Sequence, residues 1–197
     1  VVSSSKFALK AQDAGVDAVV AEGFEAGGHN GREETTSMIL IPAVANAVSI
    51  PVIAAGGIAT GRQMFAAMAL GADGVQVGSR FVCSNEASNH IHFKNAIINS
   101  NEGDTLLSMK KIVPVRLLRN NFFFFFKEAE LNGASAEKLS EILGRGRAKK
   151  GMFEGDIENG ELEIGQVSSL INDIKPAAEI LKEIWNDFQH AIKRPFD

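Results

Sequence analysis

Residues 51–61 read PVIAAGGIATG, an apolar run followed at once by a loop with three glycines. The run at residues 51–55 is typical of a short buried strand, and residues 62–70 beyond the loop have the composition of a helix. A strand, a glycine-rich loop and a helix in this order form a βα unit, which implies a parallel sheet. This stretch therefore predicts an α/β protein.

The same alternation continues on both sides of this stretch. We expect further strands at residues 1–4, 17–21 and 74–77, and further helices at residues 6–14 and 37–48. Glycine-containing loops follow the strands, and a (β/α)8 barrel carries its chemistry at that end of its strands. Four strands are half of such a barrel. We therefore interpret the chain as a TIM-type (β/α)8 barrel of which only the C-terminal strands are present.

From residue 85 on, the alternation weakens. We expect helices at residues 87–99, 135–143 and 174–188, and an extended segment at residues 109–118. Pro114 should confine that segment to the edge of a sheet, because proline cannot donate to a ladder. The predicted organisation is a half barrel with the phosphate loops at residues 1–105 and a small, mostly helical appended segment at residues 106–197.

Two features of the C-terminal part have a specific pattern. Five residues of the last predicted helix share one face, on which it should pack across the domain: Ala177, Ile180, Leu181, Ile184 and Phe188. Residues 122–126 are five consecutive phenylalanines. We expect this run to be buried or covered by a partner, because nothing amphipathic surrounds it that would favour a membrane contact.

Composition excludes several classes of protein. The chain has 197 residues, of which 45% are hydrophobic and 22% charged, and a formal net charge of −4. The mild acidity argues against a nucleic-acid partner, and no apolar run is long enough to cross a bilayer. A single cysteine, Cys83, cannot form an intramolecular disulfide. We therefore expect a cytoplasmic enzyme and, because the first residues read as the end of a strand, a fragment of a longer protein.

Two glycine loops follow neighbouring strands and precede helices. The first is residues 54–61, and the second is Gly78-Ser79-Arg80-Phe81. Glycine lets the backbone approach a ligand closely, and free N–H groups at the start of a helix attract an anion. Barrels often hold a phosphate with the loops after their last two strands. The pair predicts a phosphate-bearing ligand, while the absence of a Walker lysine and of a Gly-x-Gly-x-x-Gly after a strand disfavours ATP and a Rossmann dinucleotide.

A third loop carries a histidine. Residues 22–31 read EGFEAGGHNG and follow the strand predicted at residues 17–21, so His29 should lie on the same rim as the phosphate loops. Imidazole titrates near neutral pH, which suits proton abstraction or polarisation of a substrate oxygen. His29 is thus a candidate catalytic residue.

Together, the segments AEGFEAGGH (21–29), PVIAAGGI (51–58) and GVQVGSRF (74–81) resemble the nitronate monooxygenase family, formerly called 2-nitropropane dioxygenase. That family includes the FMN-dependent enoyl-ACP reductase II. Residues 155–166 resemble its C-terminal part, so the likeness covers most of residues 1–182. The resemblance implies an FMN-binding TIM barrel with a small added domain. It also implies oxidation of an alkyl nitronate or nitroalkane by flavin and oxygen, and it leaves a homodimer open.

The resemblance also implies roles for individual residues. His29 matches the family's active-site histidine, which would act as a base toward a nitroalkane or steady nitronate oxygens. The FMN phosphate would lie on the backbone of Gly56, Gly57, Gly78 and Ser79. Glu22, Gly27 and Gly28 match positions that line the flavin, and Gln76 is a further candidate to face it.

Two other functions stay open. The first is an NADH- and FMN-dependent enoyl-ACP reductase, which keeps the same histidine and phosphate loops; the basic run at residues 144–151 favours an acidic carrier partner. The second is a non-catalytic fragment without flavin, because the family's first strands and their flavin loop are absent. We expect no metal site, since His90 and His92 lack carboxylate companions at ligand spacing, and no catalytic role for Cys83.

Overall fold

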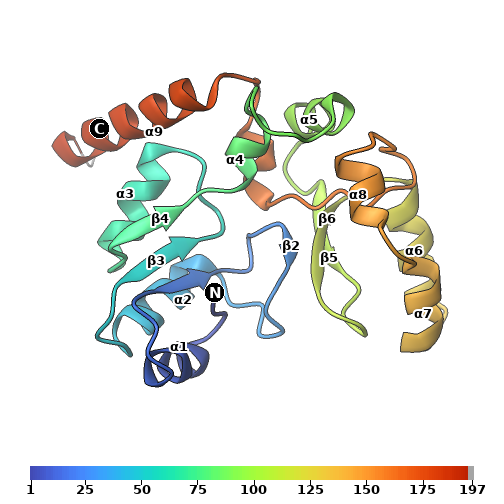
Figure 1. Cartoon of the computed structure of the whole chain (residues 1–197), viewed down its shortest axis with the longest axis horizontal. Helices are drawn as coiled ribbons and strands as arrows, with labels where there is room; N and C mark the ends of the chain where they lie inside the picture. Colours follow the sequence, from blue (N-terminus) through green and yellow to red (C-terminus); the bar gives the residue numbers. More distant parts are fainter. Residues whose placement is uncertain (195–197) are drawn as a thin grey trace.

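The computed structural model describes residues 1–194, which form two bodies side by side (Figure 1). The first body has a parallel sheet in the order β1-β3-β4, made of β1 (Val19–Glu22), β3 (Val52–Ala55) and β4 (Gly74–Gln76). The second body has an antiparallel sheet in the order β2-β6-β5, made of β2 (Gly28–His29), β6 (Val115–Leu118) and β5 (Thr105–Ser108). The predicted α/β class is confirmed.

Helices cover both sheets. Those of the first body are α1 (Ser5–Asp13), α2 (Ser37–Ala45), α3 (Gly61–Ala69), the one-turn α4 (Ser79–Val82) and α9 (Ala177–Lys193). The others are α5 (Ile91–Ile98), α6 (Asn121–Leu131), α7 (Ala136–Leu143), α8 (Arg147–Met152) and a 3₁₀ turn at Gln166–Leu170. Among the described residues, no helix has both the length and the apolar character that crossing a bilayer requires.

A local capping signal fixes the start of α3, the helix that follows β3. Thr60 caps α3, because its hydroxyl accepts from Gln63 N–H at 3.2 Å while the Gln63 side chain accepts from Thr60 N–H at 3.1 Å. This cap ends the loop that follows β3 at a defined residue. The strand predicted at residues 1–4 is only a single bridge, in which Val2 pairs with Ala21 of β1. The prediction for this segment is therefore wrong in length but right in place.

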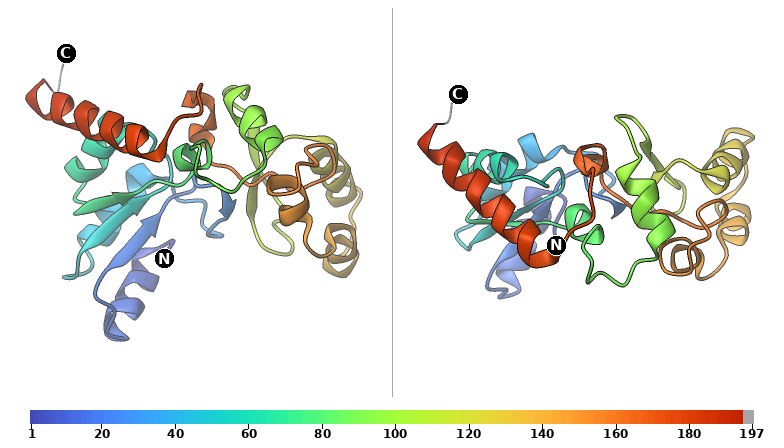
Figure 2. Two further views of the ribbon diagram at one scale, coloured as in Figure 1. Left: turned by 45° about the horizontal axis from the view of Figure 1, so that its top comes forward. Right: turned by 90° about the horizontal axis from the view of Figure 1, so that it is seen from above.

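The C-terminal helix returns to the first body. In both views of Figure 2, α9 lies across α3, and the backbones meet at Gly61, where a Cβ would stand 2.1 Å from the amide nitrogen of Phe188. Ile180, Ile184 and Phe188 are buried in this contact, which confirms that the helix packs across the domain. Leu181 does not belong to the buried face and is 62% exposed, because it lies one residue, about 100° of helical rotation, beyond Ile180. The predicted domain boundary at residue 105 stays a prediction.

The second sheet corrects the expectation for Pro114. Strand β6 lies between β2 and β5 and is therefore central, not an edge strand. Pro114 is tolerated because it precedes the first residue of the strand, so no ladder bond is lost, and its carbonyl accepts from Asn30 N–H at 2.9 Å. Strand β5 was not predicted.

The phenylalanine run forms most of α6. Phe122, Phe123 and Phe126 are buried against β6 and α7, whereas Phe124 and Phe125 are 56% and 59% exposed. A helix turns about 100° per residue, so five consecutive residues cannot all face one core. The expectation of burial is therefore confirmed for three of the five.

Candidate functional site

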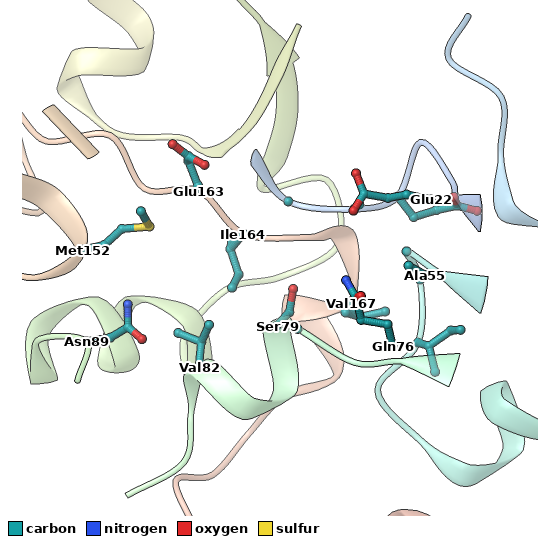
Figure 3. A pocket seen from close by; sticks show the side chains of 17 residues that line it. Glu22, Ala55, Gln76, Ser79, Val82, Asn89, Met152, Glu163, Ile164 and Val167 are labelled. Carbon is teal, nitrogen blue, oxygen red and sulfur yellow. The ribbon is translucent and has the colours of Figure 1, made fainter. Parts of the chain in front are cut away.

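A cavity of about 370 Å³ lies where the parallel strands end (Figure 3). Its lining includes seven of the nine residues that the sequence assigned to a site: Glu22, Gly27, Gly56, Gly57, Gln76, Gly78 and Ser79. This volume is within the range of small-molecule sites. Parallel strands bring these residues together because Glu22, Ala55 and Gln76 stand in one row across β1, β3 and β4.

The far wall of the cavity comes from a distant segment. Residues 161–166 run between the two bodies, and the segment is fixed at both ends by backbone bonds: Leu118 N–H donates to Leu162 O at 2.8 Å, and Gln166 N–H to Glu25 O at 2.9 Å. Figure 3 shows Glu163 and Ile164 of this segment across the cavity from Glu22, whereas Val167, just after the segment, lies near Gln76. The cavity therefore needs both halves of the chain.

The two glycine loops present bare backbone to the cavity. Gly56 and Gly57 have φ of +86° and +75°, which side-chain-bearing residues rarely adopt. Gly78 has nothing within 4 Å of the place where a Cβ would stand, and Ser79 accepts from Gly165 N–H through its hydroxyl at 3.0 Å. The backbone at Gly78, which is bare and open, fits the oxygens of a phosphate such as that of FMN.

The histidine lies beside the cavity rather than in its lining. Strand β2 carries Gly28 and His29, which pair with Arg116 and Val115 of β6, and the His29 side chain is exposed. Glu163 lies between the cavity and β2: it lines the cavity, and a Cβ on Gly28 would stand 2.5 Å from its Oε2 atom. The roles of His29 and Gly28 stay predictions.

Carboxylates make this region acidic. Burial raises the pKa of Glu22 and of Glu163, and for Glu163 the positive charge of His29 acts in the opposite direction. Burial, together with the charge of Glu163, raises the pKa of Glu161 to about 7. Glu25 is tied down, since the N–H and hydroxyl of Ser37 donate to its Oε2 at 2.9 and 3.0 Å. Sequence reasoning missed Glu25, Glu161 and Glu163.

Arg116 anchors the loop at residues 22–31, which carries His29, through contacts with Phe24. Its guanidinium is 1% exposed, donates to Phe24 O from Nε at 3.1 Å and Nη2 at 2.8 Å, and stacks 4.4 Å from the centre of the Phe24 ring. No ion pair to Arg116 is formed within residues 1–194. A third bond runs from Nη1 to Thr105 O at 3.4 Å, so the buried charge is stabilised by two carbonyls and one aromatic face, and the loop conformation depends on it.

We expect Arg116→Met to lower the free energy of unfolding by about 2–3 kcal/mol, because the buried Phe24 carbonyl loses both of its donors. Arg119→Met is the matched control: Arg119 pairs with Asp104 at the surface, and its loss should cost less than about 1 kcal/mol. Urea unfolding of both variants measures the difference. Equal losses would show that the buried guanidinium contributes no more than a surface ion pair.

Glu161 should make stability depend on pH. The carboxyl releases its proton near pH 7 in the folded chain and near 4.5 when unfolded, so between these values the folded state binds more protons and stability falls as pH rises. Glu161→Gln should therefore match the parent near pH 4.5 and exceed it by about 2 kcal/mol at pH 8. Thermal unfolding across this range, with the exposed Glu102→Gln as control, checks the result; a parallel pH dependence of parent and E161Q would contradict it.

Cys83 and His90, for which the sequence predicted no catalytic or metal-binding role, have contacts that fit a role in stabilising the fold. Cys83 is fully buried, and burial raises the pKa of its thiol to about 11, which suits a core residue rather than a nucleophile. His90 caps α5 through its ring nitrogen, which accepts from His92 N–H at 3.1 Å. In the basic run, Lys149 and Lys150 pair with Glu154 and Asp156. Two of the four basic side chains of the run are therefore balanced by acidic partners within residues 1–194.

Comparison with known proteins gives a consistent result. The family model for nitronate monooxygenase matches residues 1–187. A probable nitronate monooxygenase of Staphylococcus aureus strain JH9 is 44% identical over 191 residues, which cover 91% of this chain and 46% of that relative. The chain thus spans less than half of the length of the curated relatives it matches.

Solved structures agree with this result. FabK from Thermotoga maritima has a TM-score of 0.92 and 41% identity, covering 98% of this chain and 61% of FabK. A nitroalkane oxidase from Streptomyces ansochromogenes has a TM-score of 0.80 and 29% identity, covering 98% of this chain and 57% of that enzyme.

Proposed function

Since this chain belongs to the nitronate monooxygenase family, we propose that its cavity binds FMN and that the chain serves flavin-dependent oxidation of alkyl nitronates by molecular oxygen. The observation that carries the proposal is the pair of glycine loops that line the cavity, in which Gly78 leaves open space where a Cβ would stand. We also infer that the parallel sheet is the C-terminal part of a TIM-type barrel, which the high TM-score over 61% of FabK supports.

Different residues of the chain would bind the phosphate, contact the rest of the cofactor and transfer the proton. Gly56, Gly57, Gly78 and Ser79 would hold the phosphate, and Glu22 and Gln76 at the strand ends would face the rest of the cofactor. When bound, FMN would accept two electrons from the substrate and pass them to oxygen. His29, beside the cavity, would take the α-proton of a nitroalkane or donate to the oxygens of a nitronate.

A second function has its own support. The similarity to FabK, at 41% identity and a TM-score of 0.92, favours an enoyl-ACP reductase that uses NADH and the same FMN site. This reading needs an acidic carrier protein to dock. In the basic run only part of the charge is available for that purpose, because Lys149 and Lys150 have intramolecular partners. We therefore place nitronate oxidation first.

The test begins with the absorbance spectrum of the purified chain before and after FMN is added, followed by gel filtration. A flavin band that elutes with the protein supports the FMN site. Oxygen uptake with a nitronate then supports the first function, and NADH oxidation that depends on an enoyl thioester supports the second. No band under either condition would refute the site and favour the flavin-free reading.

A further inference from the structure

Arg80 follows directly on the second glycine loop and is the second residue of the one-turn helix α4. Although it carries a charge, Arg80 is only 8% exposed. Gly78 and Ser79 line the proposed FMN cavity, whereas Arg80 borders a different cavity, of about 280 Å³, together with Asp173. Arg80 therefore belongs to the support of the glycine loop rather than to the surface that would contact the phosphate.

The guanidinium of Arg80 is bound to Asp173 through two bonds. Nη1 donates to the backbone oxygen of Asp173 at 3.1 Å, and Nη2 donates to its carboxylate at 2.5 Å. The same carboxylate pairs with Lys175 at 2.9 Å, and Lys175 also pairs with Glu183 of α9 at 2.7 Å. Because the Arg80 charge is buried, salt screens this ion pair less than a surface pair, and the loss of one partner is costly.

The segment that carries Asp173 is itself fixed to the chain beyond α4. The N–H of Lys175 donates to Cys83 O at 3.3 Å, and this bond holds the end of α4. The start of α4, next to the glycine loop, is held instead by the ion pair of Arg80 and by the hydroxyl of Ser79. A helix of one turn has few bonds of its own, so its orientation depends on contacts of this kind.

We propose that Arg80 is a positioning residue for the phosphate of the cofactor: its ion pair with Asp173 holds α4 so that the backbone of Gly78 and Ser79 faces the phosphate oxygens. The inference rests on the proposed function and assigns a further residue to the same site. Hydrogen bonds weaken steeply when the donor turns away from the acceptor, so a small rotation of α4 lowers the affinity for phosphate. Because Asp173 neutralises its charge, Arg80 acts through the position of the loop and not as a direct ligand.

The test measures FMN affinity and stability separately in Arg80→Met, in Asp173→Asn and in the control Arg119→Met. Arg119 pairs with Asp104 at the same nitrogen–oxygen distance of 2.5 Å but lines neither cavity. The dissociation constant for FMN is determined at a temperature at which thermal unfolding shows every flavin-free variant to be folded. R80M and D173N should each bind FMN about tenfold more weakly than the parent, and R119M should match the parent.

D173N separates positioning from simple electrostatics. Removing a negative charge next to α4 should by itself tighten the binding of an anion, whereas the loss of the anchor should weaken it. Tighter or unchanged binding by D173N overturns the proposal, and so does parent-like affinity of R80M. The double variant R80M/D173N should bind FMN no more weakly than R80M alone, because both changes break one pair; additive losses would contradict the inference. If R80M does not fold, D173N still decides.

Inorganic phosphate distinguishes a failure of this inference from a failure of the proposed function. It is titrated into the flavin-free chain and followed by the NMR signals of the Gly78 and Ser79 amides. Phosphate should shift both signals in the parent, and R80M and D173N should need about tenfold more of it for the same shift. If the parent binds phosphate in this way but not FMN, the proposed function fails and the role of Arg80 stands. Equal phosphate binding by parent and variants overturns the role of Arg80 alone, and a parent that binds neither ligand overturns both.

Discussion

Gly78→Val is expected to lower the affinity for FMN on the order of 100-fold while leaving the thermal stability of the flavin-free chain unchanged. The site of a Cβ on Gly78 is open, with nothing within 4 Å, and the residue's φ of −101° is ordinary for any side chain. A valine therefore costs the fold nothing and instead fills the space in front of the backbone. Two hydrogen bonds to a charged phosphate, each about 1.5 kcal/mol or more, would be lost.

Two further variants, Gly78→Ala and Gly56→Val, serve as comparisons for this prediction. Gly78→Ala should give a smaller loss of affinity, because one methyl group covers less of the backbone. Gly56→Val should instead damage the fold itself, since Gly56 has φ of +86° and a Cβ there would stand 2.7 Å from the carbonyl oxygen of Gly23. Titration with FMN and thermal unfolding separate the two effects. A G78V chain that binds FMN like the parent would remove Gly78 from the phosphate site.

The sequence predicted the parts of the fold that depend on local patterns. Strands β1, β3 and β4 appear as short apolar runs, and the loops after them contain glycines for a backbone reason, as the positive φ of Gly56 and Gly57 shows. Such signals lie within a dozen residues and do not need the rest of the chain. Because parallel strands end at one edge, the two glycine loops could be expected together, whereas Glu22, Gly27 and Gln76 were named only from the family resemblance.

The same reasoning missed what depends on long-range pairing. Arg116 is buried under a loop 92 positions earlier, and nothing near it in the sequence marks it as an anchor. Glu163 comes to the cavity only because residues 161–166 run between the two bodies. The edge position predicted from Pro114 is wrong because the effect of a proline depends on whether it lies inside a strand or just before one.

His29 is the clearest example of a position that local sequence patterns could not predict. The flanking glycines indicated a flexible loop on the rim of the cavity, whereas the structure places His29 on β2, paired with Val115. Periodicity could not show this strand, because β2 is two residues long and forms only against β6. The position matters for chemistry, since a ring held by a strand is better oriented than one on a free loop.

His29→Ala should lower the turnover of the FMN-loaded chain by about 100- to 10,000-fold, the usual contribution of a general acid or base. FMN affinity should stay the same, because His29 does not line the cavity that would hold the cofactor. Stability should also change little, since the side chain is exposed and β2 pairs through its backbone. Steady-state oxygen uptake with a saturating substrate, scaled to bound flavin measured by absorbance, gives the comparison.

The control for this variant is His190→Ala, an exposed histidine on α9 outside the cavity lining. Loss of turnover in H29A alone, with flavin content unchanged in both variants, assigns the proton chemistry to His29. Full activity in H29A would contradict that role and leave Glu22, a half-buried carboxyl in the cavity whose pKa is raised by burial, as the candidate base. Loss of flavin together with activity would mean instead that β2 shapes the cofactor cavity through Glu163, and that His29 acts on binding before it acts on chemistry.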